Sequence, residues 1–375
     1  MSGSLQETQR LGQSIWYDNI RRGLLASGEL EQLIKQGVTG LTSNPTIFEK
    51  AISESTDYDK ALIFLASEGQ GTQETFEHLA MEDIRAAADL LRPTFDRTEG
   101  LDGYASLEVN PHLAADTEGT VAEARRLFAE LDRPNVMIKV PATPEGIPAV
   151  RQLIGEGINV NITLIFALDM YAKVRQAYLD GLDKLASTGG DVSKVGSVAS
   201  FFVSRVDSAI DSQLDDKISG GAAGLKELLG KAAIANAKLA YREFNDTFGQ
   251  SRFANLRSKG ANVQRPLWAS TSVKNPSYSD VLYVESLIGE HTGNTLPDVT
   301  LDAFLDHGKP KITLTSGVDE AAKALQGLQS AGVSMEQVTF KLLADGVKAF
   351  ADSFDALLGK VAPKRLQLLE KEGSR

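Results

Sequence analysis

The stretch NVMIKVPA, residues 135–142, is a short aliphatic run that follows Pro134 and ends beside Pro141. Most such runs in this chain are bounded by glycine or proline and separated by segments of helix length, which is typical of repeated βα units and a parallel sheet. Eight units predict an α/β fold with a closed (β/α)8 barrel and additional helices. The other seven runs are SIWYDN (14–19), GVTGLTSN (37–44), GYASLEVN (103–110), INVNITLIF (158–166), GSVASFFV (196–203), RPLWAST (265–271) and HTGNTLP (291–297).

Between these runs, apolar residues recur at steps of three and four, which predicts helices with one buried face. One such face is Val121, Ala124, Phe128 and Leu131, a second is Tyr171, Val174, Tyr178, Leu182 and Leu185, and a third is Leu343, Val347, Phe350, Phe354 and Leu357. A ninth strand-like run, PKITLTSG (310–317), is interpreted as an accessory segment. We therefore predict one barrel domain over residues 1–375, with helical elaborations near 222–263 and 310–375.

The composition excludes several classes of partner and of chemistry. The chain has 375 residues, a formal net charge of −11, no cysteine and four histidines without a metal-binding spacing. An acidic protein is repelled by nucleic acid and anionic membranes, so neither is expected as a partner, and an anionic small molecule would need a local basic site. Disulfides and cysteine chemistry are excluded. The N-terminal segment MSGSLQETQRLGQ has no apolar core and no long apolar run follows, which predicts a cytoplasmic protein.

The predicted strands carry polar residues, most of them near their C-terminal halves. A polar side chain inside an apolar barrel strand either destabilises the fold by being buried or belongs to a functional site. In such barrels the site lies at the C-terminal ends of the strands. These positions are therefore candidates for a shared site. They are Asp18, Asn44, Glu108, Lys139, Asn161, Thr163 and Ser200.

Lys139 is the sharpest candidate because its neighbours Met137, Ile138 and Val140 are apolar. Burying an ammonium group is costly, whereas a neutral amine is the nucleophile that Schiff-base formation needs. Glu108 and Asp18 pose the same problem with the opposite charge, and two carboxyl groups beside one amine could divide acid and base work. The alternatives are a buried ion pair for the lysine, and a salt bridge, a helix cap or a continuing helix for the acids.

Other candidates are suited to holding a substrate. Asn44, Asn161 and Thr163 could bind hydroxyl groups or a water, although TSNP could equally place Ser43 or Asn44 as the N-cap of a helix. Arg205 and Lys274 follow late strands, where barrels often bind phosphate. Surface salt bridges are the alternative for both.

Several segments together resemble the transaldolase family. GVTGLTSNPTIF (37–48) is similar to its first signature, and IKVPATPEGIPAVRQL (138–153) is similar to its second, which holds the Schiff-base lysine. The likeness continues through SLEVNP, INVNITLIF, SVASFFVSR and WASTSVKNP, over roughly residues 14–297. The resemblance implies an enzyme of the pentose phosphate pathway that needs no metal or organic cofactor. Its substrates would be sugar phosphates, sedoheptulose 7-phosphate or fructose 6-phosphate as donor and an aldose phosphate as acceptor.

The resemblance also implies roles for individual residues. Lys139 would form the Schiff base, Glu108 with Thr163 would hold a water that shuttles protons, and Asp18 would take the C4 hydroxyl proton. Those that would bind substrate are Asn44 and Asn161 at the dihydroxyacetone hydroxyls, Ser200 and Phe202 in the pocket wall, and Arg205 at the phosphate. Many relatives have a second arginine in a segment like SFRN, where this chain has STSVKN. Lys274, with Ser270 or Ser272, is the predicted substitute.

Two rival functions are compatible with a sugar-phosphate barrel. A fructose 6-phosphate aldolase would release free dihydroxyacetone, but such proteins tend to carry Gln at the position of Glu108 and Tyr at that of Phe202. A non-catalytic barrel that binds sugar phosphates would be expected to lack Lys139 or an acid. The residues present favour the transferase. Monomer and homodimer are both open.

Overall fold

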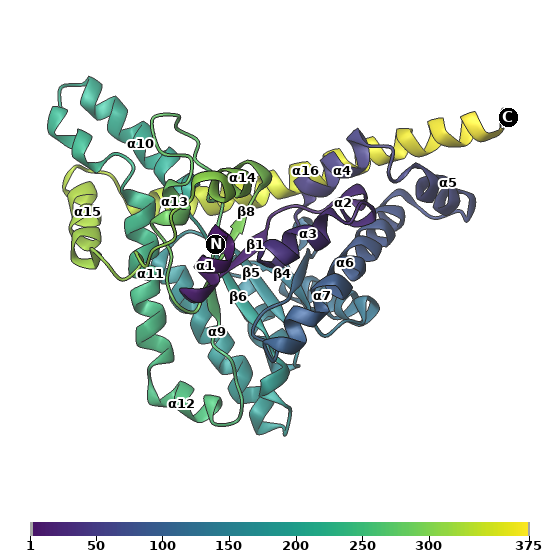
Figure 1. Cartoon of the computed structure of the whole chain (residues 1–375), viewed down its shortest axis with the longest axis horizontal. Coiled ribbons are helices and arrows are strands. Elements are labelled where there is room, and N and C mark those ends of the chain that lie inside the picture. The colour runs from purple at the N-terminus through teal and green to yellow at the C-terminus, as the bar shows by residue number, and fades with distance from the viewer. Residues whose placement is uncertain (1–2, 374–375) are drawn as a thin grey trace.

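The structure, a computed structural model, describes residues 3–373 and is built around a closed barrel of eight parallel strands in chain order (Figure 1). Each predicted run coincides with one strand to within two residues at either end, which confirms the (β/α)8 barrel. The strands are β1 (Gln13–Tyr17), β2 (Val38–Thr42), β3 (Ala105–Glu108), β4 (Val136–Pro141), β5 (Val160–Ile165), β6 (Ser197–Phe202), β7 (Arg265–Ala269) and β8 (Thr292–Leu296).

Helices surround the barrel and connect its strands (Figure 1). The predicted apolar faces fall on α7, α9 and α16. The α-helices are α1 (Ser4–Arg10), α2 (Arg22–Ala26), α3 (Glu29–Gln36), α4 (Pro45–Glu54), α5 (Asp59–Ser67), α6 (Thr72–Arg97), α7 (Thr117–Leu131), α8 (Gly146–Gly155), α9 (Leu168–Ser187), α10 (Ser204–Ser219), α11 (Ala232–Phe248), α12 (Ser251–Arg257), α13 (Leu282–Glu285), α14 (Asp298–His307), α15 (Val318–Ser330) and α16 (Met335–Gly373).

The barrel interior is apolar in the half nearer the N-terminal ends of the strands. Trp16, Met137, Val198 and Leu267 form one buried cluster, contributed by four different strands. Gly40 of β2 makes room for it, because a Cβ atom there would lie 2.4 Å from the Trp16 ring. Side chains alternate along a strand, so the residues two positions further along point inward again, nearer the C-terminal end. This alternation determines which residues of each strand point into the site.

The segments predicted as elaborations are helical. Residues 222–263 contain a 3-10 turn (Ala223–Leu228), α11 and α12, and the C-terminal region contains α15 and α16. The run at 310–317 forms no strand within the described chain, and Leu314 is buried beside Ile288 through a backbone hydrogen bond of 3.1 Å. Residues 374 and 375 of the predicted C-terminal elaboration lie outside the described residues. The assignment of the whole chain to one domain stays a prediction.

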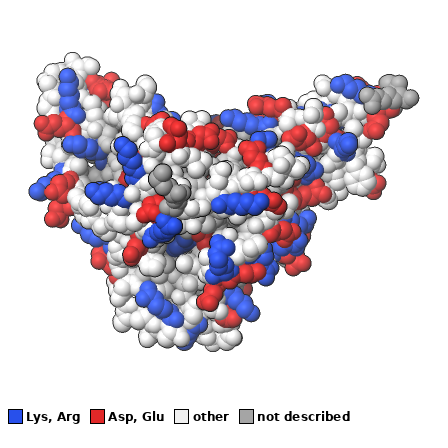
Figure 2. Space-filling model, in the orientation of Figure 1, with Lys and Arg blue, Asp and Glu red and all other residues white. Residues whose placement is uncertain are grey.

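The surface carries both signs of charge. Figure 2 shows Lys and Arg side chains interspersed with Asp and Glu over the visible face. Within residues 3–373, none of the helices combines the length and the apolar character that a membrane crossing requires, and this includes α16, the longest of them.

Candidate active site

A pocket of about 670 Å³ opens at the C-terminal ends of the strands. The structure brings most of the predicted site residues together around it, although they come from six segments of the chain. Glu108 and Asn161 lie behind the wall and do not line this pocket. The predicted residues that line it are Asp18, Asn44, Lys139, Thr163, Ser200, Phe202, Arg205, Ser270 and Lys274.

Lys139 lies two residues beyond Met137 on β4, so its side chain points into the barrel, and only 5% of it is exposed. Its Nζ donates a hydrogen bond to the Ser43 carbonyl at 2.9 Å. The same atom lies 3.4 Å from Oε2 of Glu108 and 5.8 Å from the centre of the Phe350 ring. The apolar enclosure that the sequence predicts is present, and so is the buried ion pair that was its alternative.

Glu108 is held opposite Lys139 by the pairing of β3 with β4, in which these two residues are direct partners. Burial raises the pKa of the Glu108 carboxyl, the nearby Lys139 opposes this rise, and Asp18 adds to it. Burial thus increases the affinity of Glu108 for a proton, and the adjacent amine limits that increase.

Two buried oxygens of the site have no hydrogen-bond partner among the described residues, Oε2 of Glu108 and Oγ1 of Thr163. Buried polar groups are normally satisfied, commonly by an ordered water. Glu108 also borders a second cavity of about 30 Å³, lined by Asn44, Asn110 and Phe354 among others. A space of this size holds about one or two water molecules. Thr163 does not border this small cavity but lines the larger pocket, and the predicted water between the two oxygens stays a prediction.

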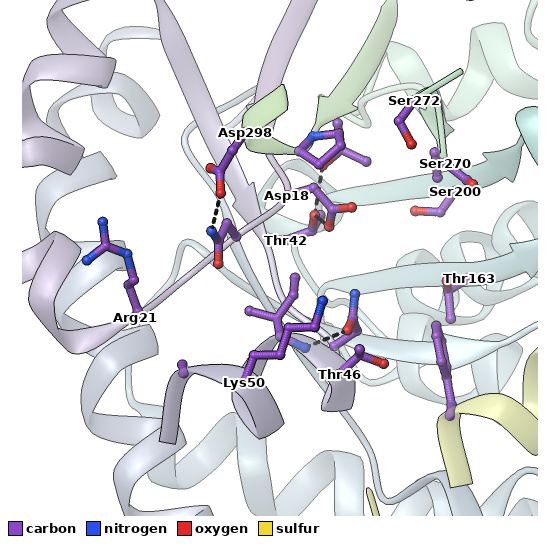
Figure 3. A pocket seen from close by; sticks show the side chains of 18 of the residues that line it. Asp18, Arg21, Thr42, Thr46, Lys50, Thr163, Ser200, Ser270, Ser272 and Asp298 are labelled. Carbon is purple, nitrogen blue, oxygen red and sulfur yellow. Dashed lines mark hydrogen bonds between the residues drawn. The ribbon is translucent and has the colours of Figure 1, made fainter. Parts of the chain in front are cut away.

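Asp18 follows β1 directly and does not continue a helix, because its backbone N–H donates to the Leu296 carbonyl at 2.9 Å. Its half-buried carboxylate accepts a hydrogen bond from Thr42 Oγ1 at 2.7 Å (Figure 3). Enclosure by the barrel raises the pKa of Asp18, whereas the Thr42 hydrogen bond and the charge of Lys139 lower it. Asp18 is therefore a carboxyl group whose basicity is increased and which opens onto the pocket.

The two candidate asparagines occupy different places. Asn44 lines the pocket and is also the N-cap of α4, since its Oδ1 accepts from the Ile47 N–H at 3.0 Å. The predicted cap is thus real, and the Asn44 amide NH2 remains for a ligand. Asn161 is fully buried and bonded on both sides: Nδ2 donates to Ser106 Oγ at 3.1 Å, and Oδ1 accepts from Ser200 Oγ at 2.7 Å. Its contact with substrate stays a prediction.

Arg205 lies in the first turn of α10, and its guanidinium group is stacked 5.4 Å from the centre of the Phe202 ring. Partial burial lowers the pKa of Arg205, with the charge of Asp18 acting in the opposite direction. Within residues 3–373 no carboxylate lies close enough to form an ion pair with it. A half-buried arginine without a counter-ion is suited to binding an anion.

A second basic position lies in the loop after β7. Lys274 is exposed and donates to Ser272 Oγ at 2.8 Å. Ser270 has a left-handed backbone, with φ of 55°, and its Oγ lies 3.1 Å from that of Ser204. Figure 3 shows Ser270 and Ser272 on the same side of the pocket as Ser200. The loop and α10 thus place two cations and several hydroxyls around one end of the pocket.

The sequence analysis missed several lining residues. Thr42 lies two positions before Asn44 on the same predicted strand, so side-chain alternation could have found it. Lys50 lies four positions after Thr46 on α4, and helical spacing could have found it. Phe350 had been assigned to a packing face, and no local signal connects it with a strand some 200 residues earlier in the chain.

The fold is a closed (β/α)8 barrel, and at the C-terminal ends of its strands a buried amine lies 3.4 Å from one carboxyl group while a second, Asp18, lines the same pocket. These features place the protein among the barrel enzymes whose active site lies on the strand ends. A sequence model described as Transaldolase/Fructose-6-phosphate aldolase matches residues 15–361. The chain therefore belongs to the transaldolase/fructose-6-phosphate aldolase family.

Relatives named transaldolase align with nearly the whole chain. The transaldolase of Thermobifida fusca is 48% identical over 364 residues, covering 96% of this chain and 98% of the relative. That of Trichodesmium erythraeum is 44% identical, covering 97% and 98%. Transaldolase 2 of Streptomyces coelicolor is 45% identical, with both chains fully covered. These full-length matches confirm the predicted activity, that of a transaldolase, a transferase.

Proposed function

We propose that the chain transfers a dihydroxyacetone unit from sedoheptulose 7-phosphate to glyceraldehyde 3-phosphate, giving erythrose 4-phosphate and fructose 6-phosphate, through a Schiff base on Lys139. One observation supports this most. The Lys139 amine is buried, reaches the pocket, and lies 3.4 Å from a carboxyl group whose pKa is raised by burial. An amine and an acid in contact are what carbinolamine formation and dehydration require.

The first half of the reaction needs proton transfers at Lys139. Its Nζ attacks the C2 carbonyl of the ketose, and the resulting carbinolamine loses water to give the iminium. Glu108 supplies and removes these protons through a water held between its Oε2 and Oγ1 of Thr163. Among the described residues neither oxygen has a hydrogen-bond partner, although Oε2 lies 3.4 Å from the Lys139 amine. Hydrogen bonding to that water accounts for two buried polar atoms in the barrel wall.

Cleavage needs a base near the C4 hydroxyl. Asp18 takes that proton, the C3–C4 bond breaks, and its electron pair moves to the iminium to form an enamine, while the aldose phosphate leaves. The increased basicity of Asp18, which burial causes, favours this step. The acceptor aldose then enters, C3 of the enamine attacks its aldehyde, and the steps reverse.

The remaining residues hold the substrate. Arg205 and Lys274 would bind the phosphate, with Ser270 as a further donor, because these groups gather at one end of the pocket. Asn44 and Ser200 line the part of the pocket near Lys139 and would bind the dihydroxyacetone hydroxyls, with Asn161 orienting Ser200.

A transfer assay separates this function from its rivals. Fructose 6-phosphate and erythrose 4-phosphate should give sedoheptulose 7-phosphate and glyceraldehyde 3-phosphate, and omission of the acceptor should nearly abolish turnover. Rapid release of dihydroxyacetone without an acceptor would instead indicate an aldolase. Tight binding of fructose 6-phosphate with no turnover under either condition would indicate a non-catalytic barrel.

The cellular setting belongs to the same proposal. An acidic chain that binds small sugar phosphates, and in which no described helix could cross a membrane, fits a cytoplasmic enzyme of the pentose phosphate pathway. A monomer or a homodimer is expected. Subcellular fractionation and light scattering at several protein concentrations test these two statements.

A further inference from the structure

The C-terminal helix α16 passes over the end of the barrel at β5. Gly346 of α16 lies so close to Leu164 that a Cβ atom on the glycine would be 2.9 Å from the leucine Cδ2. Leu164 has a left-handed backbone, with φ of 59°, in the irregular part of β5 between Ile162 and Ile165. Such a backbone is unfavourable for a leucine and persists only where its surroundings enforce it. The helix and the strand end are therefore fitted to each other.

Polar contacts fasten α16 to the segments that follow β2. Thr46 Oγ1 donates to Ser353 Oγ at 2.9 Å, and Lys364 Nζ donates to the Ile52 carbonyl at 2.9 Å. Lys360 forms an ion pair with Glu49, again on α4. These contacts recur along several turns of α16, which fixes its position across the pocket.

Phe350 is the side chain that this helix places in the pocket. Its ring is 6% exposed, lines the pocket and lies 5.8 Å from Nζ of Lys139, measured to the ring centre. One turn further on, Phe354 is equally buried but belongs to the smaller cavity beside Glu108, where its ring packs edge-on against Phe76 at 5.8 Å. Phe350 thus lines the pocket that contains the reacting amine, and Phe354 lines the cavity that borders Glu108.

We propose that Phe350 keeps bulk water away from the Lys139 adduct and so determines whether the enamine reacts with an aldose or is lost. This inference rests on the proposed Schiff-base chemistry. Loss begins when water or an acid protonates C3 of the enamine, giving the iminium of dihydroxyacetone. Water then adds to C2, the C–N bond breaks, dihydroxyacetone leaves, and the Lys139 amine is regenerated with one proton returned to solvent. The transfer cycle also ends with hydrolysis of an iminium, so protonation of C3 is the step that separates loss from transfer. An apolar ring over the amine keeps bulk water from C3.

The test is the ratio of dihydroxyacetone release to transfer, measured on fructose 6-phosphate with and without erythrose 4-phosphate. Phe350→Ala should raise this ratio about tenfold or more. A tenfold change needs only a small shift of the barrier to release relative to the barrier to transfer, and admitting water to the site should supply it. Phe350→Leu retains an apolar side chain of similar bulk, so its ratio should remain within about threefold of the parent's. Leu357→Ala is the matched control, because Leu357 is a fully buried apolar side chain on the same helix that lines neither cavity.

Each outcome decides the question. An increased ratio in Phe350→Ala, with little change in Leu357→Ala, supports the assignment. An unchanged ratio in Phe350→Ala overturns it, and so does an equal increase in both variants, which would indicate general loosening of α16. Borohydride trapping of each variant with fructose 6-phosphate distinguishes a failure of the Schiff-base function from a failure of the role assigned to Phe350. If no adduct forms even in the parent, the Schiff-base function fails, whereas an adduct with an unchanged ratio contradicts the role of Phe350 alone.

Discussion

The Nζ atom of Lys139 lies 3.4 Å from Oε2 of Glu108, and their side chains are 6% and 5% exposed. A buried pair of this kind adds little net stability, because desolvation of the two charges offsets their attraction. Removal of one partner nevertheless destabilises the protein, because it leaves the other charge buried without compensation. The arrangement is better explained by chemistry than by stability. It also makes the two residues testable as a pair.

Lys139→Met should abolish transfer and lower the free energy of unfolding at pH 7 by up to about 3–5 kcal/mol, since Glu108 then has to be buried without its partner or take up a proton. The loss should shrink as the pH falls, because protonation of Glu108 becomes easier. Adding Glu108→Gln should restore most of the stability without restoring activity. Denaturant unfolding of the single and double variants at two pH values measures this, and a double variant less stable than Lys139→Met would contradict it.

Thr42→Val should change the pH dependence of kcat/KM. The Thr42 hydroxyl donates to Asp18 Oδ1 at 2.7 Å and lowers the pKa of that carboxyl, so its removal should raise the pKa further. A base with a higher pKa is protonated at higher pH, and the acid limb of the profile should therefore move upward. Thr39→Val, on the same strand but away from the pocket, is the control. A limb that stays in place or moves down would show that Asp18 is not the base.

Arg205→Ala should raise KM for phosphorylated acceptors by about tenfold or more, the size of one charge-assisted hydrogen bond. Lys274→Ala should have a smaller effect, about two- to fivefold, because this lysine is exposed and its interactions are screened by water. Unphosphorylated erythrose or glyceraldehyde should be used equally well by parent and variants. Equal losses with both kinds of acceptor would argue against a phosphate site at these residues.

Asp207→Asn should stabilise the protein at neutral pH. Burial raises the pKa of Asp207 to about 6, although the Ala233 N–H and the Tyr283 hydroxyl donate to its oxygens. A carboxyl group whose pKa is higher when folded destabilises the fold at pH 7, and this penalty disappears as the pH falls through 6 toward the unfolded value near 4. The variant should gain about 1–3 kcal/mol at pH 7.5 and almost nothing at pH 4.5. A gain that does not depend on pH would contradict this.

The sequence predicts the barrel and most of its site because both depend on short-range patterns. Each strand is a short apolar run, and the register of parallel neighbours brings strand ends to one rim, so Glu108 and Lys139 meet without any long-range information. Asn44 shows that two interpretations of one residue can both hold, since it caps α4 and lines the pocket.

The rest depends on contacts between distant segments. Helical periodicity identifies Phe350 as part of a buried face, but not that α16 crosses the end of the barrel. The resemblance puts Asn161 at the dihydroxyacetone hydroxyls, whereas in the structure its side chain is buried and hydrogen-bonded to Ser106 and Ser200, outside the set of residues that line the pocket. Such placements are set by packing, which a linear pattern does not encode.

The central claim is a covalent bond between Lys139 and the ketose. The protein should be incubated with fructose 6-phosphate, reduced with borohydride and digested, and the peptides should be mapped by mass. We expect a reduced dihydroxyacetone adduct on the peptide that contains Lys139, and none in Lys139→Met. An unmodified Lys139 peptide, or an adduct on another lysine, would contradict the account.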